Sequence, residues 1–371
     1  MMDKLKILMS LPTKHHVEIA LDEVTGLQEL GYHCNSFNYA AKTGYDSKTG
    51  RLMVVFSNAF SLIKVARRFH PDIIYFNSRL EILAMVRDFL TINLVKFFYH
   101  KKVRFVIKTH GSDIEVLEDS RFLIKKIILP FFKKNISGWL FLSSEEKTKI
   151  NAIGYFDPDK IFVTKNIVRV DQFHHDLDFK KRHNIPDDHK ILLFVGRIIA
   201  AKGIFEVLDA FAKIQDKHKV SLLIVGDGDE FDAVKERAAK IAGANIILTG
   251  FIPEQEVVNY YSNADVLVFP TFFAEGFPMA LFNAVGAGLA IVTTRIRAAS
   301  DFLSEPDNCL WVEAKDAGDV SQKLDRLLQS EALVTAMRKN NVETAKQFSQ
   351  HQVTLELSHI FEQIIRQQPN G

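Results

Sequence analysis

The sequence is poor in cysteine and in long apolar runs, and each shortage excludes a class of protein. Its two cysteines, Cys34 and Cys309, are too few for a disulfide framework or a cysteine-based zinc cluster. No apolar run reaches the roughly 18 residues of a membrane span, because charged residues interrupt the best candidate, residues 80–99. Residues 1–16 lack the apolar length and the cleavage site of a signal peptide. These absences favour a cytoplasmic protein.

The motifs of several large enzyme classes are also missing. The sequence has no Walker-type phosphate loop and no nucleophilic GxSxG elbow, and Gly226-Asp227-Gly228 lacks the third glycine of a dinucleotide fingerprint. It has no helix-turn-helix, zinc or RNA-binding motif, so we expect no nucleic-acid partner. The Asp-x-Asp pairs at residues 176–178 and 227–229 are of a kind that is common by chance, and we expect no metal site there.

The composition is that of a soluble globular protein with an uneven distribution of charge. The 371 residues are 47% hydrophobic and 25% charged, which suits two domains of ordinary size. Residues 1–185 contain 29 Lys and Arg against 20 Asp and Glu, whereas the remainder contains 18 against 25. This asymmetry indicates two domains with different partners, and the basic half suits a phosphate or an anionic membrane.

Short apolar segments recur along the chain with helix-length stretches between them. Several are continuous apolar runs, which is typical of parallel strands covered on both faces. The pattern predicts an α/β protein with two doubly wound, Rossmann-like parallel sheets, which would face each other across a cleft. A helix at 15–30 should end at Gly31, and a last helix should span 353–365. The expected strands are residues 5–11, 33–39, 72–77, 104–110, 138–143, 161–166, 191–196, 220–226, 245–251, 266–271, 289–294 and 309–313.

A strand-to-helix turn with two cations occupies residues 195–211. The strand ends at Gly196, Arg197 and Lys202 lie in the turn, and Gly203 precedes the helix. Backbone N–H groups and partial positive charge at a helix N-terminus, together with two cations, suit a phosphate or diphosphate. The alternative is an ordinary turn with solvated cations.

A second motif occupies residues 270–288, where a strand-end loop leads into a helix of small residues. Gly276 allows close approach of a ligand to the backbone, and the Glu275 carboxylate can accept hydrogen bonds from sugar hydroxyls. Pro278 suits the first helical turn. The alternative is a helix cap followed by close packing.

A third motif, KTHGSDIE at residues 108–115, follows a strand of the first half. His110 and Asp113 can donate and accept hydrogen bonds with a sugar. The alternative is a turn in which Ser112 or Asp113 caps a helix.

Together these motifs resemble those of retaining glycosyltransferases of family four, which have the GT-B fold. The resemblance covers nearly the whole chain and is densest over residues 191–318. Its parts are HGSD, Ser143-Ser144 after a strand, Asn166 before FxxHH, VGR followed by KG, IVGDGDE, LTGFIPEQEVVNYYSNADVLVFP, EGFP and the helix of small residues.

The resemblance implies a role for each matching residue. Arg197 and Lys202 would neutralise the donor diphosphate as the glycosidic bond breaks, and Glu275 would bind the donor sugar. His110 would lie near the reacting carbon, and Asp113 would support its loop. The other donor-binding positions that it implies are Gly196, Gly250, Phe251, Ile252, Gly276, Phe277, Pro278 and Asn283. The cation pair would do what a metal does elsewhere, so neither a metal nor a cofactor is implied.

Two positions depart from the family pattern. The family's second glutamate is Asn283 here, and an amide offers the ribose only an uncharged acceptor. The family's glycine pair after the first strand is replaced by the larger residues Pro12-Thr13-Lys14-His15-His16, which would reshape the acceptor side.

The function implied is transfer of a sugar, with retention of configuration, from a UDP-, GDP- or ADP-sugar to a lipid-linked or growing glycan in bacterial surface polysaccharide assembly. The alternatives are a GT-B epimerase or phosphorylase, and a non-catalytic glycosyltransferase-like subunit. We assign residues 1–180 to an acceptor-side domain, 181–350 to a nucleotide-sugar-binding domain, and 351–371 to a helix that returns to the first domain.

Residues 121–134, RFLIKKIILPFFKK, combine five cations with eight large apolar residues and no acid. This is more apolar surface than one core-facing stripe uses, and Pro130 should end or kink the helix and turn Phe131 and Phe132 outward. We expect this segment to dock peripherally on the anionic inner face of a membrane. A buried helix with solvated lysines is the alternative. The cations are Arg121, Lys125, Lys126, Lys133 and Lys134.

Overall fold

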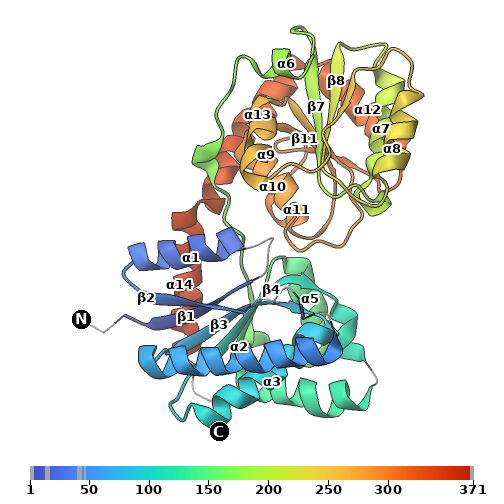
Figure 1. Cartoon of the computed structure of the whole chain (residues 1–371). Coiled ribbons are helices and arrows are strands. Elements are labelled where there is room, and N and C mark those ends of the chain that lie inside the picture. Colours follow the sequence, from blue (N-terminus) through green and yellow to red (C-terminus); the bar gives the residue numbers. More distant parts are fainter. Residues whose placement is uncertain (1–3, 13–16, 40–43, 46, 120, 368–371) are drawn as a thin grey trace. The chain divides into compact units, whose positions relative to one another are not determined.

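The computed structural model describes residues 4–12, 17–39, 44–45, 47–119 and 121–367, and it divides the chain into two compact units (Figure 1). The first unit contains the chain up to Ile167, the segment Glu275–Phe277 and the residues from Gln350 onward. The second contains Val168–Ala274 and Pro278–Ser349. Each unit is built on its own six-stranded parallel sheet, as the apolar segments predict.

The first sheet has the strand order β2-β1-β3-β4-β5-β6. All six segments expected in the first half form strands, and β3 and β4 continue past their expected ends. Buried side chains on both faces of β1 and β3 explain why their sequences are almost continuously apolar. The strands are β1 (Lys6–Leu11), β2 (His33–Asn38), β3 (Ile73–Leu80), β4 (Arg104–Ser112), β5 (Ile136–Phe141) and β6 (Ile161–Val163).

Helices cover both faces of this sheet and form two separate cores. One core lies beneath α2 (Lys48–Phe69), α3 (Ile82–Phe98), α4 (Leu129–Asn135) and α5 (Ser144–Ile153). The other lies beneath α1 (Val17–Glu29), which ends before Gly31 as expected, and the last helix, α14 (Gln350–Arg366).

The last helix belongs to the first unit, where it packs beside α1 (Figure 1). The Phe361 ring lies edge-on to Tyr75 of β3, with 5.3 Å between ring centroids. Gly26 of α1 makes the close approach possible, because a Cβ there would come within 2.6 Å of Thr354 Cγ2. The apolar stripe in the last helix thus closes the core of the first sheet, although it lies at the far end of the sequence.

The segment 121–134 differs from its expected shape. Pro130 neither ends nor turns the helix, because a π-helical turn at Ile124–Ile128 leads directly into α4 and places Pro130 in its first turn. Phe132 is buried, and the Phe131 ring packs against Phe89 with 4.8 Å between centroids. The prediction that these two rings point outward is therefore wrong. Three other apolar side chains of this stretch are exposed: Phe122, Leu123 and Ile127.

The second sheet has the order β12-β11-β10-β7-β8-β9, and its six strands also match the expected segments. The strands are β7 (Lys190–Val195), β8 (Val220–Val225), β9 (Ile246–Leu248), β10 (Val266–Phe269), β11 (Ala290–Thr294) and β12 (Leu310–Val312). The helices are α6 (Phe179–Arg182), α7 (Ile204–Ile214), α8 (Phe231–Ala239), α9 (Glu254–Asn263), α10 (Met279–Gly286), α11 (Arg297–Phe302), α12 (Ala317–Leu328) and α13 (Glu331–Ala345).

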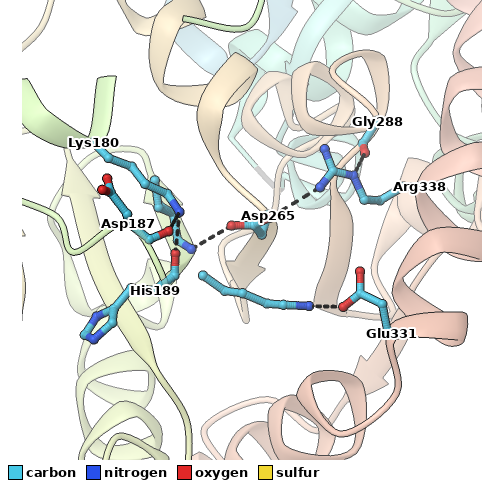
Figure 2. Close-up of polar contacts among 9 residues, drawn as sticks. Lys180, Asp187, His189, Asp265, Gly288, Glu331 and Arg338 are labelled. Atoms are coloured by element: carbon cyan, nitrogen blue, oxygen red, sulfur yellow. Dashed lines mark hydrogen bonds and ion pairs between the residues drawn. The ribbon is translucent and has the colours of Figure 1, made fainter. Parts of the chain in front are cut away.

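Ion pairs and hydrogen bonds connect charged side chains at the amino edge of the second sheet (Figure 2). The Asp265 carboxylate accepts a hydrogen bond from the backbone N–H of Ile191 at 2.8 Å and forms an ion pair with Arg338 of α13 at 3.4 Å. Lys190 forms a second ion pair with Glu331 of the same helix. Acidic partners therefore neutralise Lys190 and Arg338 at this edge.

Candidate functional site

Each sheet has one place where the strand order reverses, between β7 and β10 in the second unit and between β1 and β3 in the first. Open α/β sheets bind ligands outside the carboxyl ends of their strands at such a switch point, because the connecting helices there leave toward opposite faces. The predicted site residues that follow β7 and β10 therefore lie where a ligand is expected.

Two cations converge on one aromatic ring at the switch point of the second sheet. Arg197 Cζ lies 5.0 Å from the centroid of the Phe273 ring, and Lys202 Nζ lies 5.2 Å from the same centroid. Lys202 is only 4% exposed and also lies 5.2 Å from the Phe269 ring, whereas Arg197 is exposed. The negative face of an aromatic ring attracts cations, so the ring of Phe273 can hold both near each other.

The turn that carries Lys202 is held against the loop after β10. Gly203 follows Lys202 with φ of +77°, and a Cβ on it would come within 2.4 Å of the Pro270 carbonyl oxygen. The backbone N–H of Phe272 donates to the Ala201 carbonyl at 2.9 Å. A glycine is therefore needed after Lys202 so that the two loops can meet.

The GDGD stretch after β8 has a packing role. A Cβ on Gly226 would come within 1.9 Å of the Gly196 carbonyl oxygen, and one on Gly228 within 2.5 Å of the Ile198 carbonyl. The backbone N–H of Ile198 donates to the Asp227 carbonyl at 2.9 Å. These glycines allow the loops after β7 and β8 to lie in direct contact beside Arg197.

Three of the predicted donor-binding residues, Gly250, Phe251 and Ile252, follow β9 at the same edge. The Gly250 carbonyl accepts a hydrogen bond from the backbone N–H of Gly226 at 3.0 Å, so this loop adjoins the glycine turn after β8. Gly250 has φ of +70°, and the Phe251 side chain that follows is 73% exposed. Ile252 lies next to it in the same loop. The structure thus brings Gly196, Gly250 and Phe251 to one edge.

The helix of small residues after β10 packs closely against neighbouring side chains. Pro278 precedes α10, and a Cβ on Gly286 would come within 2.8 Å of Val168 Cγ1. Asn283 is half-buried, and its amide forms a hydrogen bond with the phenol of Tyr261, whose pKa is raised by burial. Glu275 is half-buried, and Gly276 and Phe277 beside it are buried.

In the first unit, hydrogen bonds link His110 across the switch point. His110 Nε2 lies 2.8 Å from Asn77 Oδ1, and Asn77 Nδ2 donates to the Ser10 carbonyl at 2.9 Å. The second contact sets the orientation of the Asn77 amide, so Oδ1 is an acceptor and His110 Nε2 carries a proton. One ring orientation and one tautomer are thus favoured at the carboxyl ends of β1, β3 and β4.

Asp113 is exposed directly after β4, and its backbone N–H donates to the Leu80 carbonyl at 2.9 Å. Its side chain makes no capping hydrogen bond to the short helical turn that follows. The Ser112 hydroxyl instead donates to Glu146, which also accepts from Ser143 Oγ at 2.9 Å. The loop after β4 is therefore tied to α5.

A buried ion pair lies beneath His110. Lys108 Nζ is 2.5 Å from Glu23 Oε1 of α1, and the two side chains are 0% and 1% exposed. Burial raises the pKa of the nearby Tyr75 phenol well above its usual value, and the Glu23 charge adds to this rise. The pair connects α1 to the strand that carries His110.

Sequence reasoning missed four of these residues. Asn77, Glu146 and Lys108 depend on contacts between segments far apart in the chain, for which the sequence has no local signal. Phe273 could have been found from the sequence, because it is an aromatic residue in the strand-end loop that carries Glu275, and aromatic rings attract cations such as Arg197 and Lys202. The departure at residues 13–16 lies outside the described residues.

Two parallel sheets of this topology form the GT-B fold of glycosyltransferases. Residues 176–347 match the family model "Glycosyl transferases group 1", so this part of the chain is similar to that family. The match spans the second unit's six strands, including the turn with Arg197 and Lys202.

Relatives and solved structures agree with this assignment. The chain is 27% identical to a Campylobacter jejuni N,N'-diacetylbacillosaminyl-diphospho-undecaprenol alpha-1,3-N-acetylgalactosaminyltransferase over 51% of this chain and 48% of that one. It is 24% identical to the capsular polysaccharide biosynthesis glycosyltransferase CapM of Staphylococcus aureus over 76% and 75%. Anabaena HepE in complex with UDP and glucose has the same fold, with a TM-score of 0.74 and 14% identity over 96% and 99%. The matched part of the chain spans about half the length of the Campylobacter jejuni relative and of an uncharacterized glycosyltransferase of Methanocaldococcus jannaschii, to which it is also 27% identical.

Proposed function

We propose that the protein transfers a sugar from a nucleoside-diphosphate sugar to a lipid-linked or growing glycan, with retention of configuration, in bacterial surface polysaccharide assembly. The observation that carries the proposal is the pair of cations, Arg197 and Lys202, held against Phe273 at the switch point of a group 1 glycosyltransferase domain. Relatives named for undecaprenol-linked and capsular acceptors support the class of acceptor.

The chemistry rests on the leaving group. When the glycosidic bond breaks, negative charge grows on the donor diphosphate, and fixed cations stabilise that charge more than they stabilise the ground state. Arg197 and Lys202 supply these charges, and the Glu275 carboxylate accepts hydrogen bonds from the sugar. Because Lys202 is buried, its charge acts through less solvent than that of Arg197.

The first unit contributes the remaining polar groups. His110 and Asp113 contact the transferred sugar, and the hydrogen bond from His110 to Asn77 keeps the imidazole in one orientation. The second acidic position of the family pattern is served by Asn283, which leaves the ribose an uncharged partner. An enzyme that acts on a lipid-linked acceptor must reach the membrane that holds the acceptor, which here is the cytoplasmic face of the inner membrane. The cations of residues 121–134 contribute to this membrane contact.

Thermal-shift and product measurements across UDP-, GDP- and ADP-sugars test the proposal. We expect one donor class to raise the melting temperature and to be consumed in the presence of a glycan or lipid-linked acceptor. An epimerised sugar formed without an acceptor, or turnover that depends on inorganic phosphate, would assign the site to an epimerase or a phosphorylase. Binding of no donor would favour a non-catalytic subunit.

A further inference from the structure

Exposed apolar side chains are concentrated on one part of the first unit. Among the described residues, fourteen large apolar side chains are exposed, and nine of them lie on α2, α3 and the stretch 121–128. These nine are Leu52, Met53, Phe56, Phe60, Leu83, Phe97, Phe122, Leu123 and Ile127. We name the surface that they form the α2–α3 face. Scattered exposed apolar residues are ordinary, but a concentration of this kind marks an interaction surface.

The side chains of this face are continuous from one helix to the next. The Phe60 ring of α2 lies 5.7 Å from the ring of Phe98 on α3, and Phe98 lies 4.8 Å from the exposed Phe97. Arg67 of α2 donates to the Phe98 carbonyl at 2.8 Å. The two helices therefore share an apolar surface that Arg67 borders.

Helix α3 is apolar on both sides, although only one side meets the core. Its buried residues include Met85, Ile92 and Val95. On the opposite side, Leu83 is 74% exposed and Phe97 is 71% exposed, with the partly exposed Leu90 between them at two-turn spacing. A helix that is apolar all round is normally covered on every side. The outer side of α3 thus lacks a covering element among the described residues.

A basic pocket lies at the C-terminal end of this face, where β4 and β5 begin. The pocket has a volume of about 460 Å³, and Lys96 of α3 is among its lining residues. Six of its lining residues are cations and none is an acid. The cations are Lys96, Lys101, Lys102, Arg104, Lys134 and Lys160.

The pocket and the apolar face are parts of one surface. Lys96, which lines the pocket, is the chain neighbour of Phe97, and its Nζ lies 6.0 Å from the Phe131 ring. Lys101 Nζ lies 3.5 Å from His70 Nε2 at the end of α2. The nearby Asp72 accepts a hydrogen bond from the backbone N–H of Lys6 and does not line the pocket. An anion that enters the pocket therefore meets several positive charges close to the exposed ring of Phe97.

We propose that the α2–α3 face docks the first unit on an anionic lipid bilayer, with the basic pocket taking lipid phosphate groups. The apolar side chains enter the boundary between headgroups and acyl chains, and the cations meet the negative surface. Charge complementarity selects this occupant, because a pocket with six cations and no acid among its lining residues suits an anionic surface. None of the described helices is long and apolar enough to cross a membrane.

This inference rests on the proposed function, because only that proposal makes the acceptor lipid-linked. It adds the surface that would bring the protein to such an acceptor. Helices α2 and α3 both run from the carboxyl edge of the first sheet, where His110 lies, toward its amino edge, because they connect parallel strands. The face therefore extends along the sheet from the side of His110 to the basic pocket. It includes Phe122, Leu123 and Ile127, and it is centred on α2 and α3 instead of on residues 121–134.

Vesicle co-sedimentation of the full chain tests this surface. Phosphatidylcholine vesicles with phosphatidylglycerol should pellet the protein, and phosphatidylcholine alone should pellet far less of it. The double variant Leu83→Gln/Phe97→Gln should weaken binding to anionic vesicles at least about ten-fold. The triple variant Lys101→Gln/Lys102→Gln/Lys134→Gln should weaken it about a hundred-fold, since each lysine near the surface contributes about five-fold.

Matched controls come from the second unit. Leu177→Gln/Val342→Gln changes two exposed apolar residues, and Lys235→Gln/Lys240→Gln/Lys339→Gln changes three exposed lysines. Both control variants should bind anionic vesicles as the wild type does. The melting shift produced by nucleoside diphosphates should be the same in all four variants, which separates this inference from the proposed function.

Three results would overturn the inference. One is equal pelleting with neutral and anionic vesicles, and another is no pelleting with either. The third is an oligomer, seen by size exclusion, that Leu83→Gln/Phe97→Gln dissolves while vesicle binding is absent. That result would assign the face to a second copy of the chain.

Discussion

The two units hold their positive charge at opposite edges of their sheets. In the second unit, Asp265 and Glu331 neutralise cations at the amino edge (Figure 2). The cation pair Arg197 and Lys202 lies at the carboxyl edge. In the first unit, Lys108 beside the carboxyl edge is buried against Glu23, and the exposed Arg79 at that edge pairs with Glu81. Six cations line a pocket at the amino edge. The same layered architecture thus offers an anion site at a different edge in each unit.

This difference shows that the excess charge is not a requirement of the fold. A parallel sheet with flanking helices forms in both units, although acidic side chains neutralise cations at the amino edge in the second unit and at the carboxyl edge in the first. Under the two proposals above, a donor diphosphate would account for the cations in the second unit, and an anionic bilayer would account for those in the first. Each arrangement can be broken by a substitution, and the expected effects decrease from the buried ion pair of the first unit to Asn283 of the second.

The largest effect should follow from breaking the buried pair of the first unit. Lys108→Met leaves the Glu23 carboxylate buried without its cation, which should cost about 3–5 kcal/mol in the free energy of unfolding. Thermal melting should show a lower transition temperature. The double variant Glu23→Leu/Lys108→Met should recover most of the loss, because no buried charge remains. Equal destabilisation by the single and double variants would show that the pairing is not what matters.

The next effect concerns catalysis in the second unit. Lys202→Ala removes a charge-assisted contact with the donor diphosphate, worth about 1.5–3 kcal/mol, so turnover should fall by at least about ten-fold. The fold should persist, because Lys202 lies in a loop turn. Lys213→Ala on α7, an exposed lysine of the same unit, is the control. A folded Lys202→Ala variant with wild-type kinetics would reject the assignment.

How far the sequence predicts the structure depends on the range of the interactions involved. Short apolar segments predict all twelve strands, and the signal is strongest in strands such as β1, β3 and β7, where burial on both faces leaves a continuous apolar run. The positions of Arg197 and Lys202 also follow from a local turn. The Asn77 contact of His110 joins neighbouring strands through their register, which no local pattern contains. The sequence pattern predicts the wrong orientation for Phe131 and Phe132, because it gives no sign of the π-helical turn that accommodates Pro130.

A smaller effect should follow from removing the ring between the cations. Phe273→Leu keeps an apolar side chain but loses the aromatic face, and each cation–π contact is worth about 0.5–2 kcal/mol. Donor affinity should fall about three- to thirty-fold, mainly through KM. Phe272→Leu is the matched control, because its ring meets Lys315 instead. Similar losses in both variants would point to general loop packing.

The smallest effect should come from Asn283→Glu. If the side chain faces the ribose, a charged acceptor should leave donor binding equal or tighter by about five-fold. The control Asn259→Glu adds the same charge to an exposed position of α9. Isothermal titration with the preferred donor measures the change. A lower melting temperature without any gain in donor affinity would reject the ribose role, because a buried carboxylate without a partner destabilises the fold.

The most direct test of whether the two units bind different anions measures nucleoside-diphosphate binding and vesicle binding for the same two variants. Lys202→Ala and Lys101→Gln/Lys102→Gln/Lys134→Gln are each titrated with UDP, GDP and ADP and with anionic vesicles. Lys202→Ala should lose most of its nucleoside-diphosphate binding and keep its vesicle binding, and the triple variant should do the reverse. If either variant lost both activities while folded, or kept both, the two units would not have the separate anionic partners that their charged edges indicate.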